Sequence, residues 1–380
     1  MKSRSPVLAH LASNFLLWPK IVRVFAIGLL VAGNPVLAAD KPPDIRVTHL
    51  PATANAGPIV KIAGNIISRY IAYGDIADDT TFDLTGLKSG PWEGHPIATA
   101  FSAGDQPVPP KNLRIVGGVI HGTIPLEWNW VLTHAFGGSA FYTVASGRQV
   151  VEGARIHNVQ DGWRPRETGY FRARSYPNNS SFHMRHCYLT GIRDDAVEND
   201  EFMPGEIEDS LFDGVWTFLS EQNEGINGIR NPLIPAFGPN EDPDIRITRS
   251  LVRLAMTSAN EKGPGTWFKL HGYQTKNHHI RITDSAFAVE HQPRHGWGQV
   301  NFPKASSFHG NNFLLWLGEP GRYGGKVPPE VTFLEGPAAR EKWHELRNRW
   351  LEAHGYEPRS PNDWNPMEAP VAAPKRAASK

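Results

Sequence analysis

A short pattern of apolar and small residues recurs along the middle of the chain and predicts a series of short strands. Its plainest copies are residues 245–252, IRITRSLV, and residues 280–287, IRITDSAF. Each copy alternates apolar and polar residues, then has one small residue, and then reaches a second apolar residue. Strands this short cannot bury a face on their own, so we expect the copies to stack on one another.

Six copies of this pattern place similar residues at equivalent positions. The first apolar position holds Ile115, Val151, Met184, Ile207, Ile247 and Ile282. The small position holds Gly118, Ala154, Cys187, Ser210, Ser250 and Ser285. The second apolar position holds Ile120, Ile156, Leu189, Phe212, Val252 and Phe287. The copies are unevenly spaced, as expected for a solenoid of β-coils with loops of different length, so we predict that each set stacks as one column.

This pattern resembles that of the right-handed parallel β-helix proteins of the pectin-lyase-like class, over roughly residues 60–316. The resemblance implies an all-β fold, a right-handed parallel β-helix solenoid, which we place at residues 40–336. An antiparallel β-sandwich, which also has many short strands, is the alternative. The class includes polysaccharide lyases, glycoside hydrolases, esterases, phage tailspikes and adhesin stalks, so the fold does not define an activity.

Both ends of the chain differ from this middle part. Residues 1–39 have the pattern of a signal peptide, because a basic region precedes an apolar stretch at residues 24–31 and small residues precede Asp40. The apolar stretch is too short to span a bilayer comfortably. We therefore expect export to the periplasm or secretion, without stable membrane insertion after cleavage; an uncleaved anchor is the alternative.

The C-terminal region predicts a helix followed by a disordered tail. Residues 337–357 open with proline and carry Trp343, Leu346, Trp350 and Leu351 at helical spacing. We expect this helix to cap the open end of the solenoid, since an unpaired strand edge invites association. Residues 358–380 are rich in Pro, Ala and Lys and are predicted to be disordered.

The net charge and the cysteine content bear on the possible partners and on the chemistry of the chain. The 39 basic and 38 acidic residues give a formal net charge of +1, which does not favour nucleic acid as a partner. Cys187 is the only cysteine, so the exported chain has no internal disulfide. It occupies the small-residue position, and we expect a packed thiol rather than a nucleophile.

Three glutamates follow successive copies of the pattern at the same distance and form the first candidate site. They are Glu198, Glu221 and Glu261. Equivalent positions on adjacent coils lie about 4.8 Å apart, so these carboxylates repel one another unless a cation or a raised pKa relieves them. Asp200 shares the strand face of Glu198. We take Glu198, Asp200 and Glu221 as candidate catalytic residues.

Further acidic residues lie just before Glu198. Asp194 and Asp195, with Glu261, are candidate ligands for a hard cation such as Ca²⁺. Asp161 occupies the equivalent of Asp194 one coil earlier. The Asp194-Asp195 pair resembles the double aspartate of polygalacturonases, and residues 308–310 resemble their His-Gly element. Their Asn-Thr-Asp and Arg-Ile-Lys elements are not found at the expected places, which leaves membership of that family open.

A basic and aromatic set completes the candidate residues. Alternation in residues 266–272 puts Lys269 and His271 on one strand face with Trp267, where they would orient a carboxylate or transfer a proton. Residues 164–166, Arg-Pro-Arg, resemble the stretch that supplies the base of pectate lyases, whose Trp-Ile-Asp-His element is absent. The candidate substrate-binding residues are Trp163, Arg166, Arg193, Trp216 and Trp267.

Three interpretations of the acidic residues stay open. A cation held by them would bind an acidic sugar for elimination, paired carboxylates would hydrolyse a glycosidic bond, or the acids are solvated turn residues without chemistry. The leading hypothesis is an exported polysaccharide lyase or glycoside hydrolase acting on an acidic polysaccharide in a cleft along one sheet. The alternative is a non-catalytic polysaccharide-binding or surface β-helix protein.

Overall fold

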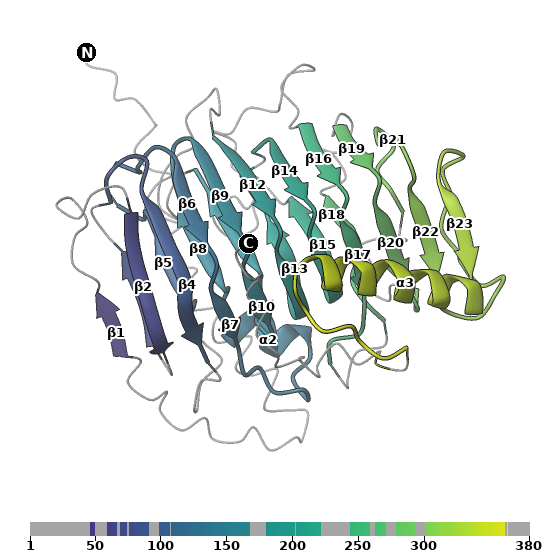
Figure 1. Cartoon of the computed structure of the whole chain (residues 1–380), viewed down its shortest axis with the longest axis horizontal. Helices are drawn as coiled ribbons and strands as arrows, with labels where there is room; N and C mark the ends of the chain where they lie inside the picture. The colour runs from purple at the N-terminus through teal and green to yellow at the C-terminus, as the bar shows by residue number, and fades with distance from the viewer. Residues whose placement is uncertain are drawn as a thin grey trace, which may run out of the picture. The chain divides into compact units, whose positions relative to one another are not determined.

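Parallel β-strands make up most of the fold, as the computed structural model of the chain shows (Figure 1). The structure describes residues 46–49, 59–66, 69–73, 76–90, 99–106, 108–167, 180–201, 203–221, 244–258, 263–270, 279–292, 301–361 and 363. All of them belong to one unit, residues 45–380. The predicted signal peptide, residues 1–39, lies outside the described residues.

The strands stack in three ladders, which the chain visits in turn, and we call one passage through all three a coil. Ladder A consists of β2 (Ile59–Ile66), β4 (Thr81–Ser89), β6 (Leu113–Val116), β9 (Arg148–Glu152), β12 (Ser181–Arg185), β14 (Gly205–Glu208), β16 (Asp244–Thr248), β19 (His279–Thr283) and β21 (Ser307–His309). Ladder B consists of the ends of β2 and β4, then β7 (Val119–His121), β10 (Arg155–His157), β13 (Tyr188–Glu198), β15 (Leu211–Glu221), β17 (Leu251–Leu254), β20 (Ala286–Val289), β22 (Phe313–Trp316) and β23 (Thr332–Glu335). Ladder C consists of β1 (Arg46–His49), β3 (Arg69–Tyr73), β5 (Phe101–Ala103), β8 (Phe141–Val144), β11 (Trp163–Arg166), the ends of β13 and β15, and β18 (Phe268–Leu270).

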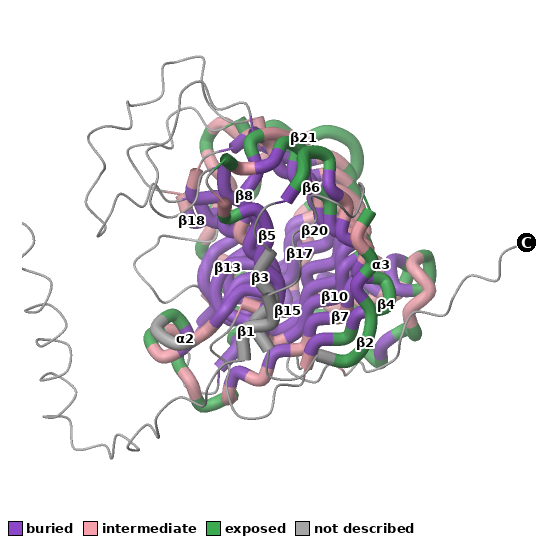
Figure 2. Tube along the Cα trace, turned by 90° about the vertical axis from the view of Figure 1, so that its left-hand side faces the viewer, coloured by how far each residue is buried: buried purple, intermediate pink, exposed green. Residues whose placement is uncertain are grey.

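The predicted apolar columns are confirmed. In ladder A, Ile115 pairs with Val151, and the series continues through Met184, Ile207, Ile247 and Ile282 without a slip. The second column, from Ile120 to Phe287, is continuous in ladder B. All its members are buried in one core (Figure 2). Because every strand pairing in the described part of the chain is parallel, the antiparallel sandwich is wrong.

The corner between ladders A and B explains the small-residue column. The residue before the corner has a positive φ of 42–53° in His186, Asp209, Arg249 and Asp284. The next backbone N–H then donates to a serine hydroxyl one coil further on, from Cys187 to Ser210 at 3.1 Å and from Ser250 to Ser285 at 3.1 Å. Cys187 is buried, as predicted, and burial raises the pKa of its thiol to about 12.

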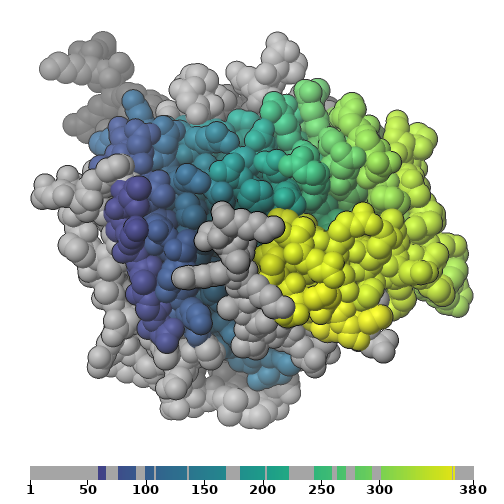
Figure 3. Space-filling model, viewed as in Figure 1, coloured from purple at the N-terminus to yellow at the C-terminus, as the bar shows by residue number. Residues whose placement is uncertain are grey.

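The C-terminal helix is confirmed, but its predicted position is wrong. α3 (Pro337–Ala353) runs across the outer face of ladder B instead of closing the end of the stack (Figures 1 and 3). Many outward residues of ladder B are apolar and pack against α3 in a second core. Its members include Tyr188, Leu211, Leu251, Ala286, Leu315, Trp343, Trp350 and Leu351. Apolar side chains on the outside of a sheet have to be covered, and the helix serves this purpose.

The first residues after α3 are ordered, which corrects the predicted start of the disordered tail. Arg359 is 5% exposed and its Nη1 lies 3.6 Å from Oδ2 of Asp213 in β15. Arg347 of α3 also lies 3.6 Å from this oxygen, and Arg253 of β17 donates to Oδ1 at 2.6 Å. Burial opposes ionisation of Asp213, but these guanidinium groups outweigh it and lower the pKa. Residues 364–380 lie outside the described residues.

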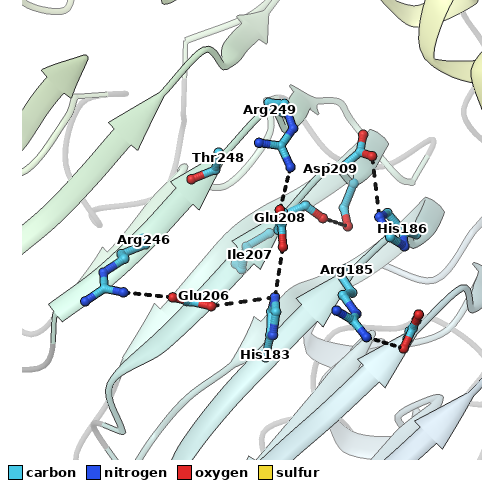
Figure 4. Close-up of polar contacts among 12 residues, drawn as sticks. His183, Arg185, His186, Glu206, Ile207, Glu208, Asp209, Arg246, Thr248 and Arg249 are labelled. Carbon is cyan, nitrogen blue, oxygen red and sulfur yellow. Dashed lines mark hydrogen bonds and ion pairs between the residues drawn. The ribbon is translucent and has the colours of Figure 1, made fainter. Parts of the chain in front are cut away.

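The outer face of ladder A carries a network of charged side chains. His183 of β12 points between two glutamates of β14, with its Nε2 3.3 Å from Oε2 of Glu208 and 3.7 Å from that of Glu206 (Figure 4). Arg148 donates to its Nδ1 at 2.7 Å, which leaves the ring proton on Nε2, facing the carboxylates. None of the helices in the described part of the chain has the length and apolar character needed to cross a membrane.

We predict that Asp213→Asn destabilises the protein strongly, because it leaves three arginines near a neutral amide. Breaking a buried ion pair costs about 3–5 kcal/mol, and urea unfolding followed by tryptophan fluorescence measures the loss. Glu345→Gln removes the exposed ion pairs of Glu345 with Lys342 and Arg349 and serves as the control. Its effect should stay below about 1 kcal/mol. Equal losses in the two variants would show that Asp213 does not hold α3 in place.

Candidate active site

One extra residue in β13 shapes the candidate site on the outer face of ladder C. Ile192 pairs with Val215, but Asp195 pairs with Thr217, so β13 has one residue more than β15 over this interval. The preceding coil shows the same slip, because Ile156 pairs with Leu189 whereas Trp163 pairs with Val197. Such a bulge re-aims side chains. Here it brings the neighbours Asp194 and Asp195 into a common cluster.

The cluster consists of the carboxylates of Asp161, Asp194, Asp195, Glu198 and Asp200 together with three cations, and we call it the carboxylate cluster. All five acids are at most 6% exposed. Ligand atoms of Asp161, Asp194 and Asp195 lie within 4.8 Å of one another. The backbone N–H of Asp195 also donates to Oδ1 of Asp161 at 3.2 Å. Neighbouring coils thus place three carboxylates around one point.

Each cation of the cluster contacts two carboxylates. Lys269 Nζ lies 3.1 Å from Oδ2 of Asp195 and 3.7 Å from Oδ1 of Asp194. Arg164 Nε lies 2.5 Å from Oε2 of Glu198, and its Nη1 lies 3.6 Å from Oδ2 of Asp161. Arg166 Nη2 lies 3.5 Å from Glu198 and 3.3 Å from Asp200. The positive charges are therefore shared among the protein's own acids.

The environment separates the acids into protonated and ionised groups. Burial raises the pKa of Asp195 to about 7, with Lys269 opposing and the charges of Asp194 and Glu198 adding to the rise. Burial and the charge of Glu198 raise the pKa of Asp161 well above its usual range. For Asp194, burial is outweighed by Lys269 and by hydrogen bonds from His134 and Trp130, which lower the pKa. Adjacent residues thus favour opposite protonation states.

The short helix α2 (Trp130–Phe136), between β7 and β8, contacts the cluster from the solvent side. Trp130 Nε1 donates to Oδ1 of Asp194 at 2.8 Å, and His134 Nδ1 lies 3.2 Å from Oδ2. The His134 side chain is 53% exposed, whereas Asp194 is almost fully buried. Neither residue is predicted from the sequence, because no pattern in residues 122–138 indicates that this loop folds back onto β13.

Two of the three predicted Ca²⁺ ligands, Asp194 and Asp195, lie together in the described part of the chain. Asp161, Asp194 and Asp195 offer the oxygen ligands that a hard cation takes. The ammonium group of Lys269 already supplies positive charge to two of them. Although burial opposes it, these carboxylates raise the pKa of Lys269, so it stays charged. The third predicted ligand, Glu261, lies outside the described residues. The described donor set therefore suits a lysine-neutralised cluster better than a Ca²⁺ site.

The predicted glutamate column is wrong, because the bulge shifts the register by one residue. Glu198 pairs with Ser220 rather than Glu221. Glu221 is fully buried, and its Oε1 accepts from Asn199 Nδ2 at 2.7 Å on the other face of the strands. Glu198 and Asp200 belong to the carboxylate cluster, where Asp194 and Asp195 have the central places.

Several predicted sugar-binding residues have structural roles instead. Trp163 and Trp267 are fully buried in the core, and Trp163 Nε1 donates to Thr143 Oγ1 at 2.9 Å. Arg193 is 2% exposed and donates to the carbonyl oxygens of Ile124, Pro125 and Trp128, so it anchors the loop before α2. Trp216 is buried with Trp130 stacked over it at 6.1 Å.

Two of the predicted basic residues, Arg166 and Lys269, do face the acids. His271, the other predicted proton-transfer residue, lies outside the described residues. Asp161 also belongs to the carboxylate cluster, although it was not among the predicted site residues. Its place one coil before the Asp194-Asp195 pair is the feature of the sequence that indicates this.

No protein-family model, curated protein or solved structure matches this chain. A likeness of fold alone would also leave the function open, because one fold carries many activities. The chemistry of the carboxylate cluster is therefore the basis for a function.

We predict that Lys269→Met destabilises the protein more at pH 8 than at pH 4. Without the ammonium group, Asp194 and Asp195 have a higher pKa in the folded than in the unfolded chain, where it is about 3.9. Little penalty exists below that pH, and it grows as the pH rises because the unfolded chain loses these protons while the folded chain retains them. At pH 8 we expect a loss of about 3 kcal/mol or more, measured by urea unfolding.

Lys111→Met, at an exposed lysine, is the control for this variant and should have a small effect at both pH values. An equal loss for Lys269→Met at pH 4 and pH 8 would mean that the lysine contributes packing rather than charge.

Proposed function

We propose that the protein is a glycoside hydrolase with a right-handed parallel β-helix fold of the pectin-lyase-like class. Three parallel ladders visited in turn, with columns of stacked side chains, support the fold. The observation that carries the activity is the opposite protonation of the neighbours Asp194 and Asp195. Two acids whose surroundings push their pKa values apart are typical of a catalytic pair in which one donates a proton and the other acts as an ionised nucleophile.

In this proposal Asp195 is the general acid and Asp194 the nucleophile. Asp195 gives its proton to the glycosidic oxygen as the bond from that oxygen to the anomeric carbon breaks. Because the oxygens of the two acids lie within 4.8 Å of each other, too close for a water between them, Asp194 attacks the anomeric carbon as that bond breaks and forms a glycosyl ester. Water then hydrolyses the ester, Asp195 takes the proton of the water, and Asp194 is released as the carboxylate. Asp161, which contacts the backbone of Asp195 and also favours the protonated form, helps to keep the acid proton in the cluster. Lys269 prevents the two neighbours from both becoming neutral.

The charge distribution favours hydrolysis of an uncharged sugar over elimination on a uronate. Elimination needs positive charge to neutralise the carboxylate of the sugar while a base removes the adjacent proton. The three cations of the cluster each contact two protein carboxylates, so an acidic sugar would have to compete with buried acids. We therefore propose neutral polysaccharide as the substrate in place of the acidic one predicted from sequence. The signal-peptide pattern of residues 1–39 supports a location of the protein outside the cytoplasm, either in the periplasm or secreted.

A substrate panel tests this function. Purified protein is incubated with neutral glucans, xylan, galactan and arabinan, and with polygalacturonate and alginate, in the presence of Ca²⁺ or of EDTA. We expect new reducing ends from a neutral polysaccharide, without the ultraviolet absorbance of unsaturated sugars and without dependence on Ca²⁺. Asp195→Asn should lower the rate by about 10²-fold or more, whereas Asp244→Asn, on the outer face of ladder A, should leave it unchanged.

Unsaturated products from an acidic polymer would show that the protein cleaves by elimination and not by hydrolysis. Binding of a polysaccharide without any cleavage would favour the non-catalytic alternative. Full activity of Asp195→Asn would remove the carboxylate cluster from the mechanism.

A further inference from the structure

α2 is a short helix with well-defined ends. The side chain of Asn129 accepts a hydrogen bond from the backbone N–H of Leu132 at 3.1 Å, which caps its start. The N–H of Gly137 donates to the carbonyl oxygen of Thr133 at 2.6 Å and closes its end. The two caps fix the direction of the side chains over only seven residues.

Two aromatic side chains, one helical turn apart, project from α2 as a unit. Trp130 and His134 stand at positions i and i+4, which lie on the same helix face. Their rings stack with centroids 4.8 Å apart and planes inclined by 19°. Trp130 also stacks with Trp216 of β15, with centroids 6.1 Å apart. The pair therefore lies between α2 and β15.

This pair binds both oxygens of one carboxylate. Trp130 donates to Oδ1 of Asp194 and His134 Nδ1 contacts Oδ2, as described above. An ionised carboxylate only accepts hydrogen bonds, and an indole N–H only donates, so the contacts match the ionised form of Asp194. Among the described residues, Asp195 receives a side-chain hydrogen bond from Lys269 but none from α2, and its Oδ1 is left without a partner.

We propose that Trp130 and His134 are positioning residues that fix Asp194 as the ionised nucleophile and leave the acid proton to Asp195. This inference rests on the proposed glycoside hydrolase function. The pair does not touch the reacting atoms; it decides which of two adjacent carboxyl groups plays which role. The bulge in β13 presents both neighbours to the site, and α2 makes them unequal.

The charged groups around His134 determine its protonation state and therefore its effect on the pKa of Asp194. Its hydrogen bond to Asp194 raises the pKa of His134, burial and Lys269 lower it, and the charges of Asp194 and Glu198 raise it further. The net result is a raised pKa, so the imidazolium stays charged beside Asp194 to a higher pH than an ordinary histidine. Removal of this charge raises the pKa of Asp194 and moves the acidic limb of the pH–rate profile to higher pH.

The first experiment is the pH profile of kcat/KM on the polysaccharide that the panel identifies. His134→Asn keeps an N–H donor near the position of Nδ1 but loses the charge, and His134→Ala loses both. We expect the acidic limb to move up by about 0.5–1 pH unit in both variants. Trp130→Phe keeps the stacked ring without the N–H and should move it in the same direction by less. His309→Asn, at an exposed histidine of β21, should match the wild type.

A profile in which His134→Asn and His134→Ala lower the rate by one factor at every pH, with the acidic limb unmoved, would overturn the proposal and leave α2 a purely structural role. A second readout does not need activity. The titration of the His134 ring is followed by NMR in the wild type and in Asp194→Asn, and we expect its pKa to fall in the variant. An unchanged titration would refute the contact itself, whereas inactivity of the wild-type protein with the expected titration would refute only the hydrolase function.

Discussion

The structure depends on the register of parallel strands from one coil to the next. Stacked parallel strands repeat about every 4.8 Å, so a residue is placed next to its equivalents by register alone. The columns that begin at Ile115 and Ile120 keep this register through the described coils and bury one continuous core. A single extra residue in β13 changes it locally. The core continues through Val197 and Leu219, whereas the outward side chains near Asp195 acquire a new arrangement.

Two buried charge clusters on the outside of the coils differ in their balance of acids and cations. This difference distinguishes a structural cluster from a candidate catalytic one. Around Asp213, arginines outnumber the carboxylate, and Arg347 also donates to the carbonyl oxygens of Ser360 and Asp363. That cluster has a fixed protonation state and holds α3 and the following residues on ladder B. In the carboxylate cluster, acids outnumber cations, and Asp195 has a pKa near neutrality. Perturbed acids of this kind mark functional sites more often than static ion pairs do.

The sequence predicted the repeating core but not the details of the site, and the reasons are physical. Apolar and small residues at fixed phases specify columns such as Ile207 to Ile247, because each strand has to bury its inner face. The glutamate column failed because a bulge of one residue leaves no mark in composition or alternation. The position of α3 does have a signal in the sequence, because the consecutive apolar pairs Leu211-Phe212 and Leu251-Val252 indicate strands that are buried on both faces.

The protonation of Asp195 is the most direct test of this account. Selective ¹³C labelling of aspartate carboxyl carbons allows each to be titrated by NMR, and Asp195→Asn identifies the signal. The account predicts one buried aspartate that titrates at about pH 7 and disappears in this variant, with Asp194 ionised throughout the neutral range. A pKa for Asp195 near 4, the ordinary value for this side chain, would contradict it, because the cluster would then contain no acid at neutral pH.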